Sequence, residues 1–151
     1  MHRILRRDLD TVERLAHEVA SGMSGPDLEA ELRELKTSGP LWQLKVSCLR
    51  YCRFVHMHHN AEDVLLFPAL RAADLSIAPV VDRLEADHLR VSDLLDAVEA
   101  AAQQLTNGHG DARERVVLGL EELHGHLLEH LDYEELQAGP VMRRLERFSG
   151  V

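Results

Sequence analysis

The sequence predicts an all-α fold, an up-down-up-down antiparallel four-helix bundle. Four long segments each carry apolar residues at alternating steps of three and four, which is the period of one helix face. Aromatic residues make up only 4% of the chain, and this favours aliphatic helix packing over a β-sandwich. A length of 151 residues suits one domain with a sizeable core, so we expect a single domain over residues 1–151.

The first long segment covers residues 2–23 and ends in a turn. Its apolar or unusual positions are His2, Leu5, Leu9, Val12, Ala16, Val19 and Met23. The run Ser24-Gly25-Pro26-Asp27 breaks the helix. A short extra helix can form over residues 28–36, before Thr37-Ser38-Gly39-Pro40 begins the next long helix with proline near its first turn.

The second long helix is expected from about Pro40 to about Ala73. Pro68 is expected to kink or end this helix, because proline lacks the backbone N–H and crowds the preceding turn. The apolar stripe of the helix, with its polar intrusions, is Leu41, Leu44, Cys48, Tyr51, Val55, His58, Glu62, Leu65 and Ala69.

Two more turns introduce the third and fourth helices. Ser76 and Pro79 mark the start of the third helix. Its stripe is Ile77, Val81, Leu84, His88, Val91, Leu95, Val98, Ala102 and Leu105. The fourth helix begins near Ala112 and is interrupted near Gly139-Pro140. Its stripe is Val116, Leu120, Leu123, Leu127, His130, Glu134, Gln137 and Val141.

Every stripe contains polar side chains where an apolar one would be expected. They are His2 in the first helix, His58 with Glu62 in the second, His88 in the third, and His130 with Glu134 in the fourth. The first and third turns are expected at the same end of the bundle. The distance to that end is 21 residues for His2 (to Met23), 18 for His58 (from Pro40), 17 for His88 (to Leu105) and 18 for His130 (from Ala112). At about 1.5 Å per residue the spread is about 6 Å, roughly one helical turn. We therefore expect the polar residues to meet at one height of the bundle.

Two buried carboxylates beside several histidines require compensation, because an unpaired buried charge is costly. A cation supplies that compensation, and imidazole and carboxylate are common metal ligands. His58 and Glu62 lie four residues apart on one helix face, and His59 is also within reach of Glu62. The sequence therefore predicts a metal site in the bundle core that would suit a pair of ions.

The remaining composition limits the partners and the location. A formal charge of -9 without a basic stripe disfavours nucleic acid and anionic membranes. Residues 1–8 lack the apolar run of a signal peptide, and no window is apolar enough to span a bilayer, so we expect a cytoplasmic protein. Cys48 and Cys52 are interpreted as small buried hydrophobes rather than a redox pair, since a four-residue spacing in a helix suits a disulfide poorly.

The polar motifs resemble those of the hemerythrin-like family, also called HHE cation-binding domains. The specific runs are His58-His59-Asn60-Ala61-Glu62-Asp63, Leu66-Phe67-Pro68-Ala69-Leu70, Glu85-Ala86-Asp87-His88 and His130-Leu131-Asp132-Tyr133-Glu134-Glu135. The opening Met1-His2-Arg3, with Arg6-Arg7-Asp8-Leu9, matches less specifically. The resemblance implies a four-helix bundle holding two Fe ions in a non-haem di-iron centre, oxo- or hydroxo-bridged when oxidised. Glu62 and Glu134 would bridge the irons, and the terminal ligands would be His2, His58, His88 and His130.

Two departures from the family pattern affect this ligand set. Oxygen-carrying hemerythrins take two histidines one turn apart from the third helix, whereas here the residue one turn before His88 is Leu84. His59 is either the missing fifth imidazole, as in some hemerythrin-like proteins, or a surface or supporting histidine. The first helix also begins at its own ligand, His2, while the other helices continue about 10 residues or more beyond this level. We therefore expect an uncovered corner, which forms either a channel or a frayed helix that retains metal weakly.

Several other polar residues have competing interpretations. His126 is expected beside the site or at its solvent edge, and Tyr51 is either a core aromatic or a donor to a bound dioxygen species. Surface positions are expected for His17, His56, His109 and His124. The spacings Glu85-x-x-His88 and Glu121-x-x-His124 imitate ferritin-like di-iron motifs, but most of these residues fall beside the apolar stripes, which disfavours that ligand set.

A histidine-rich iron site suits the binding of dioxygen, hydrogen peroxide or nitric oxide. The leading hypothesis is a di-iron protein that binds or senses one of these molecules. The alternatives are an enzyme that detoxifies peroxide or nitric oxide, an iron-responsive regulatory module, and a metal-free structural bundle. An uncovered corner favours an enzyme or sensor over a carrier, which must shield its iron from water. We expect a monomer or homodimer without nucleic-acid or membrane partners.

Overall fold

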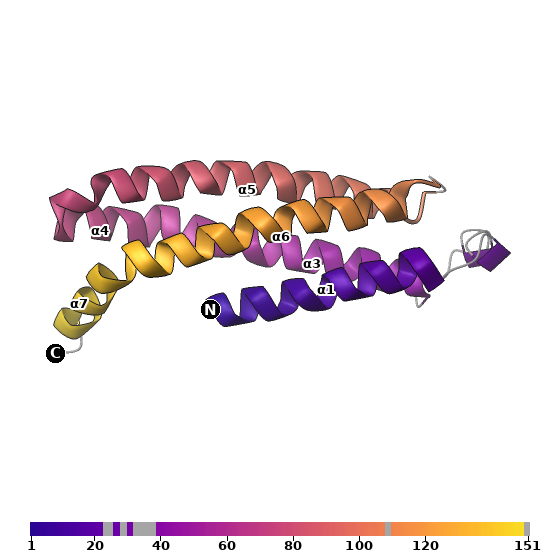
Figure 1. Cartoon of the computed structure of the whole chain (residues 1–151), viewed down its shortest axis with the longest axis horizontal. Helices are drawn as coiled ribbons and strands as arrows, with labels where there is room; N and C mark the ends of the chain where they lie inside the picture. The colour runs from indigo at the N-terminus through magenta and orange to yellow at the C-terminus, as the bar shows by residue number, and fades with distance from the viewer. Residues whose placement is uncertain (23–25, 28–29, 32–38, 108–109, 150–151) are drawn as a thin grey trace.

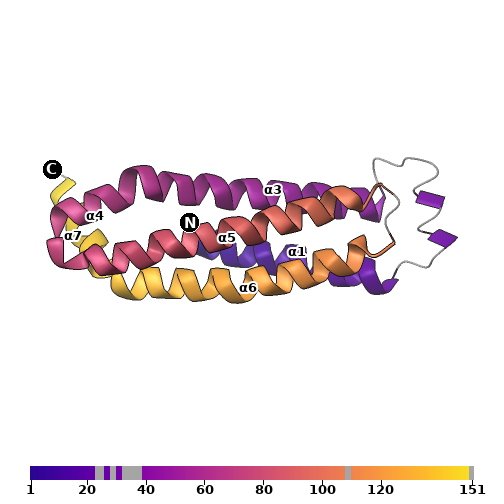
Figure 2. The ribbon, with the colours of Figure 1, turned by 90° about the horizontal axis from the view of Figure 1, so that it is seen from above.

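The computed structural model describes residues 1–22, 26–27, 30–31, 39–107 and 110–149, and every element within these ranges is helical. The predicted all-α class is confirmed. The long helices lie side by side (Figure 1, Figure 2) and are α1 (His2–Gly22), α3 (Pro40–Ala61), α5 (Ala78–Gln104) and α6 (Ala112–Gln137). Each runs in the opposite direction to the one before it in this series (Figure 1). Helices α1 and α5 each pack against α3 and α6, so the four enclose one interior.

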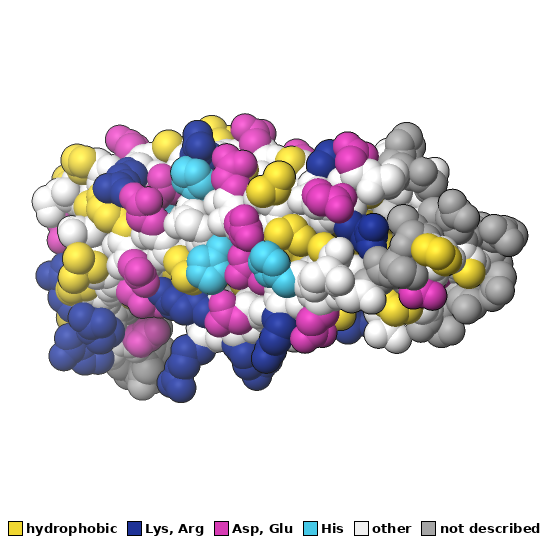
Figure 3. Space-filling view, turned by 45° about the vertical axis from the view of Figure 1, so that its right-hand side comes forward, with side chains coloured by type: hydrophobic (Ala, Val, Ile, Leu, Met, Phe, Trp, Pro, Cys, Tyr) yellow, Lys and Arg dark blue, Asp and Glu magenta, His cyan; other side chains and the backbone are white. Residues whose placement is uncertain are grey.

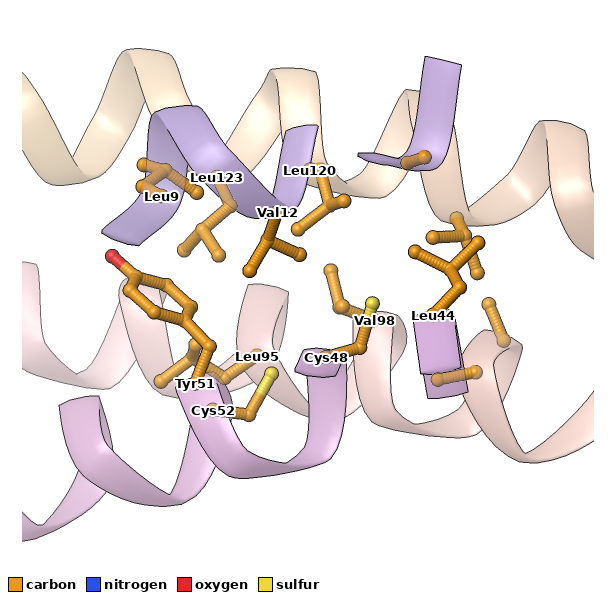
Figure 4. Packing of buried hydrophobic residues seen from close by; sticks show 14 of the residues in the cluster. Leu9, Val12, Leu44, Cys48, Tyr51, Cys52, Leu95, Val98, Leu120 and Leu123 are labelled. Carbon is orange, nitrogen blue, oxygen red and sulfur yellow. The ribbon is translucent and has the colours of Figure 1, made fainter. Parts of the chain in front are cut away.

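The predicted apolar stripes fill this interior. Figure 4 shows side chains from all four helices meeting there, among them Leu9, Val12, Leu44, Cys48, Tyr51, Leu95, Val98, Leu120 and Leu123. Nearly all of them are shielded from solvent, and the most exposed of this group retains 6% of its surface. Each buried aliphatic side chain of this size stabilises the fold by about 1.5–3 kcal/mol, so the stripes are the main source of cohesion.

Truncation of one core leucine is expected to lower stability markedly. Leu95 of α5 is fully buried, so Leu95→Ala should lower the free energy of unfolding by about 2–5 kcal/mol through lost burial and a residual cavity. Leu89→Ala is the matched control, because Leu89 lies on the same helix with 73% of its surface exposed, and its effect should stay within about 0.5 kcal/mol. Urea denaturation of both variants measures the difference. Equal losses would contradict the assigned core.

A π-helical turn, η1 (Glu62–Leu66), interrupts the predicted second helix, which continues afterwards as α4 (Phe67–Ala73). The N–H of Phe67 bonds to the carbonyl of Glu62, five residues back, so the following side chains are rotated by one position. The prediction that Leu65 and Ala69 are buried is therefore wrong: both are exposed, whereas Leu66 is half-buried and Leu70 is buried. Pro68 explains the wide turn, because it has no N–H to donate and its ring crowds the preceding carbonyls.

The expected interruption at Gly139-Pro140 separates α6 from a final helix, α7 (Gly139–Ser149), which turns away from the α6 axis (Figure 1). Gln137 was predicted to face the interior, and this is wrong: it is exposed and Ala138 is buried instead, since the helix breaks at this point. Helix α7 packs on a second apolar cluster at this end of the bundle. That cluster comprises Phe67, Leu70, Ile77, Val81, Leu84, Ala138 and Val141, with Leu66, Val80, Tyr133, Met142 and Leu145 partly buried against it.

Some expectations fall on residues outside the described ranges, namely most of the short helix over 28–36, the end of the first helix at Met23, and His109. Between α4 and α5, a short 3-10 turn, η2 (Leu75–Ile77), is capped by the Asp74 side chain. On the face shown in Figure 3, basic and acidic side chains are interspersed. Among the described helices, none is long and apolar enough to cross a membrane.

Candidate metal centre

The structure brings together the seven side chains that the sequence singled out. Helix α1 contributes His2 at its first residue, and the turn η1 begins with Glu62. The others are His58 and His59 on α3, His88 on α5, and His130 and Glu134 on α6. Five of the seven retain at most 6% of their surface, namely His59, Glu62, His88, His130 and Glu134. The equal heights inferred from residue counting are thus reproduced in three dimensions.

Glu62 lies between two groups of imidazoles. Its Oε1 atom is 3.0 Å from Nε2 of His58 and 3.7 Å from Nε2 of His2. These three residues can direct ligand atoms at one ion. The other oxygen, Oε2, is 3.2 Å from Nε2 of His88. The two oxygens of one carboxylate therefore face different groups.

The second group contains three histidines, which pack as rings against one another. His59 stacks on His88 with ring centroids 3.9 Å apart, and His130 lies edge-on to both. Together with Glu62 these histidines form a second set able to direct one ligand atom each at a common ion. His59 therefore belongs to the interior, which is the geometry that a fifth imidazole ligand requires.

Glu134 also lies between the two groups. Its Oε2 atom is 3.6 Å from Nε2 of His2 and 3.6 Å from Nε2 of His130. Only 1% of this side chain is exposed. Glu62 and Glu134 are thus the two carboxylates that reach both groups of imidazoles.

Several buried polar atoms in this cluster have no hydrogen-bond partner, although they lie close to one another. They are His58 Nε2, His59 Nε2, Glu62 Oε2 and Glu134 Oε2. Buried polar atoms are almost always satisfied, so four orphans in one place indicate a bound group that supplies the missing interactions. A cation fits, because imidazole nitrogens and carboxylate oxygens direct lone pairs at it.

The facing nitrogens of His88 and His130 support the same conclusion. Their Nε2 atoms are 3.1 Å apart. The Nδ1 atom of His88 lies 2.8 Å from Asp63 Oδ1, and that of His130 lies 3.4 Å from Asp87 Oδ2. A carboxylate accepts a hydrogen bond from a ring N–H, so both Nδ1 atoms act as donors, and in the neutral form of each ring the Nε2 atom presents a lone pair. Two lone pairs at this distance repel each other unless a positive charge lies near both.

Burial and neighbouring charge set the protonation of the metal-free cluster. Burial lowers the pKa of His59 to about 2 and that of His130 to about 4, in each case with a further contribution from His88. Burial raises the pKa of Glu134 to about 9, and the adjacent Glu62 carboxylate adds to this shift. Burial also acts to raise the pKa of Glu62, but contacts with His2, His58 and His88 outweigh it and hold that pKa well below its usual value. His59 and His130 are therefore neutral near pH 7 and lie beside the ionised Glu62 carboxylate, a set of donors that can bind a cation.

Three acidic residues outside the predicted site orient its histidines. Asp63 and Asp87 accept hydrogen bonds from His88 and His130 as described, and Glu135 Oε1 lies 2.9 Å from His2 Nδ1. Each is the immediate chain neighbour of a predicted site residue, a position beside the apolar stripe that periodicity does not single out. Carboxylates that hold the far nitrogen of a metal-binding histidine fix the ring and increase its basicity.

Removal of such a carboxylate is expected to weaken metal binding without removing a ligand. For Asp63→Asn we expect metal affinity to fall by about 10–100-fold, because the amide no longer carries the charge that raises the basicity of His88. Competition with a chromophoric chelator measures the change. Asp93→Asn is the control, since Asp93 is an exposed carboxylate on the same helix as His88. The assigned role of Asp63 is wrong if both variants retain wild-type affinity.

A cavity of about 510 Å³ opens beside the centre, at the corner where α1 begins. His2, Glu62 and Glu134 contribute to its lining, together with Met1, Leu66 and Met142. Figure 1 shows α1 starting part-way along the bundle, short of the end where α4 and α7 lie. The expected uncovered corner is therefore a cavity that reaches the centre.

The other described histidines lie outside the centre and face charged partners. The nearest contacts are His17 with Glu121 (3.2 Å), His56 with Glu99 (3.5 Å), His124 with Glu13 (2.7 Å) and His126 with Arg90 (3.1 Å). Glu85 pairs with Arg71 at 3.3 Å on the surface. Glu85, Glu121 and His124 of the ferritin-like motif are therefore engaged in ion pairs away from the centre, whereas His88 belongs to the centre, so these four residues do not form a second ligand set.

Tyr51 and the two cysteines belong to the core. The hydroxyl of Tyr51 donates a hydrogen bond to the carbonyl of Leu5 at 3.1 Å. It therefore links α3 to α1 and is not directed at a ligand in the centre. Cys48 and Cys52 are buried free thiols, and burial raises the pKa of Cys48 to about 12. A thiol of that pKa stays protonated and unreactive near neutral pH.

The fold and the cluster together define a helical cation-binding protein. The sequence model of the hemerythrin HHE cation binding domain matches residues 1–142, so the chain belongs to this family. Searches of curated proteins and of solved structures found no match.

Proposed function

We propose that this chain is a non-haem di-iron protein that binds or senses a small oxidant or diatomic ligand: dioxygen, peroxide or nitric oxide. One iron would be held by His2 and His58, and the other by His59, His88 and His130. Glu62 and Glu134 would be shared by the two ions. Residues 1–151 would form one domain, an up-down-up-down four-helix bundle that acts as a monomer or homodimer in the cytoplasm.

The division of the Glu62 carboxylate is the observation that carries the proposal. Its oxygens face His58 at 3.0 Å and His88 at 3.2 Å, and these histidines belong to different groups. A single ion would leave one oxygen and one group of imidazoles without a partner in a buried site, at a cost of several kcal/mol. Two ions satisfy both groups.

Nitrogen and oxygen donors of this kind suit iron, and iron supplies the redox chemistry and the affinity for dioxygen, peroxide or nitric oxide. The group with His2 and His58 has one imidazole fewer than the other group. It is also the group whose His2 lines the cavity of about 510 Å³. A small molecule that enters through this cavity would therefore meet the less crowded half of the centre.

The same cavity favours a second candidate, an enzyme that removes peroxide or nitric oxide. A carrier has to protect its iron from water, whereas an enzyme has to admit substrate and release product repeatedly. An opening at the level of His2, Glu62 and Glu134 suits repeated exchange.

Anaerobic purification from iron-replete cells, followed by metal counting, tests the proposal. We expect two irons per chain, with absorption changes after separate additions of dioxygen, peroxide and nitric oxide. A stable oxygen adduct supports binding, and rapid oxygen evolution from peroxide supports the enzyme. Fewer than one metal per chain, or a fold and stability that chelation leaves unchanged, contradicts the proposal.

The role of His59 can be tested by metal stoichiometry. We expect His59→Ala to lower the metal content from two ions to one, because the ring lies among His88 and His130 and its Nε2 atom has no partner in the protein. His56→Ala on the same helix is the control, since His56 faces Asp96 and Glu99 at the surface. Elemental analysis of both proteins gives the result. Two ions per chain in His59→Ala would assign this histidine a packing role.

A further inference from the structure

Two arginines line the cavity beside the centre, Arg3 in the first turn of α1 and Arg143 in α7. Both are exposed. Within the described part of the chain, neither guanidinium has an ion-pair or hydrogen-bond partner. Neighbouring arginines are engaged elsewhere: Arg6 with Asp132 and Glu135, Arg7 with Asp8, and Arg144 with Asp74. The cavity is therefore bordered by two uncompensated cations.

Gly139 helps to position one of them. A Cβ atom at this residue would lie 3.2 Å from Nη1 of Arg143, so the guanidinium is folded back over the first residue of α7. Gly139 lines the same cavity. Arg143 thus lies where α6 ends, near the turn of chain that carries Glu134.

The carboxylates around the cavity are largely occupied by other cations. Glu135 is held by Arg6 at 2.7 Å and by His2 at 2.9 Å. Glu62 and Glu134 face the imidazoles of the centre. Glu146 is the remaining carboxylate of the lining, and its side chain lies on α7 without an ion pair to Arg143. The lining therefore carries more free positive than free negative charge.

We propose that Arg3 and Arg143 form a docking position for a small inorganic monoanion of the size of nitrite, which they hold at the mouth of the cavity. Guanidinium groups present planar sets of donors that match an oxyanion, and they remain charged at every physiological pH. A pair of cations at a cavity mouth also raises the local concentration of anions. Delivery to the iron centre rests on the proposed function, whereas docking on the arginines does not. Arg143 lies just beyond residues 1–142, the part of the chain that the family model matches.

Nitrogen-15 NMR of the arginine Nε–H groups tests docking directly, in the metal-free protein and again with Zn²⁺ added. Titration with sodium nitrite at low ionic strength should move the signals of Arg3 and Arg143 along saturating curves. The signals of Arg7 and Arg144 should stay in place, since these arginines already have carboxylate partners. Equal shifts at all four arginines, or none at any, would overturn the inference.

A binding experiment tests what docking does at the centre. Nitrite affinity of the iron-loaded protein, measured by absorption and calorimetry, should fall about threefold in Arg3→Gln and in Arg143→Gln and about tenfold in the double variant, as expected for exposed charges. Nitric oxide is neutral, so its affinity should not change. Arg7→Gln and Arg144→Gln are the matched controls, with nitrite affinity at the wild-type level. If the double variant and the wild type bind nitrite with equal affinity, the arginines do not deliver nitrite to the iron centre. If the protein binds no iron, the proposed function is wrong. The NMR titration of the metal-free protein then still tests whether nitrite docks on the two arginines.

Discussion

Replacing Glu62 by Gln is expected to remove both metal ions while leaving the helices folded. The carboxylate contacts histidines of both groups, at 3.0 Å and 3.2 Å, so this single change withdraws a ligand from both halves of the centre. The amide keeps the size of the side chain but carries no charge to offset the cations. We expect metal affinity to fall by at least about 100-fold, more than for loss of a supporting carboxylate.

Metal counting and thermal unfolding together measure this effect. Metal at 1,000 times its dissociation constant stabilises a protein by about 4 kcal/mol, so the wild type should unfold at a clearly higher temperature with metal than after chelation. In Glu62→Gln the two temperatures should coincide. Without metal the variant should be less stable than the wild type, because the amide no longer makes the contacts with His2, His58 and His88 that hold the pKa of the Glu62 carboxylate well below its usual value. Glu122→Gln, an exposed carboxylate on α6, is the control. Two ions bound to Glu62→Gln with unchanged affinity would refute the bridging role.

Apolar periodicity predicted the interior of the long helices well, because burial there follows the regular period of an α-helix. The whole predicted stripe from Ile77 to Leu105, which spans α5 and the residues on either side of it, is buried, with His88 inside it. The same regularity is why residue counting placed four polar positions at one height. Because a straight helix rises by a fixed distance per residue, the height of each side chain along the bundle is closely determined by its position in the sequence.

The errors lie where the helical period is broken. Leu65 and Ala69 were misplaced because the π-turn at Glu62–Leu66 inserts one residue, and Gln137 was misplaced because α6 ends at that residue. Pro68 and Pro140 mark both places in the sequence. However, a proline is compatible with a kink, a stop or a wider turn, and tertiary packing decides among these outcomes.

The supporting carboxylates and the ring stacking could not be predicted from spacing. Asp63, Asp87 and Glu135 each reach a histidine on another helix, and such a contact depends on the rotation of both helices. His59 is similar: its place beside His88 follows from how α3 faces α5, which one sequence does not determine.

Without metal, the stability of the protein is expected to peak near pH 6.5. The pKa of Glu134 is raised from 4.5 to about 9, so the folded chain holds this proton more tightly than the unfolded chain, and stability is lost as the pH rises from 4.5 to 9. The raised pKa of His2 adds to the loss above pH 6.5: burial opposes that shift, but contacts with Glu62 and Glu135 outweigh it. The pKa values of His59 and His130 are lowered from 6.5 to about 2 and about 4, so their contributions are lost as the pH falls below 6.5.

The slopes on the two sides of the maximum follow from proton counting. Each group contributes at most about 1.4 kcal/mol per pH unit over its own window. Between pH 6.5 and 9 Glu134 makes stability fall. Between pH 4.5 and 6.5 the two histidines oppose Glu134 and outweigh it, so stability rises with pH. Urea denaturation of the chelated protein at a series of pH values measures the profile.

Bound metal should change the alkaline side of this profile. Cations bind ionised carboxylate and neutral imidazole, so metal binding releases the proton of Glu134, and the stabilisation by metal should increase as the pH rises from 6.5 to 9. Comparison of the metal-loaded and chelated proteins cancels the contribution to stability of surface groups that titrate equally in both. Glu134→Gln is the informative control, because it should reduce the alkaline loss in the chelated protein to the part that His2 causes. If the stability of the chelated wild type instead rises steadily from pH 6.5 to 9, Glu134 is ionised in that range. In that case burial and repulsion from Glu62 do not raise the pKa of Glu134 in the metal-free centre.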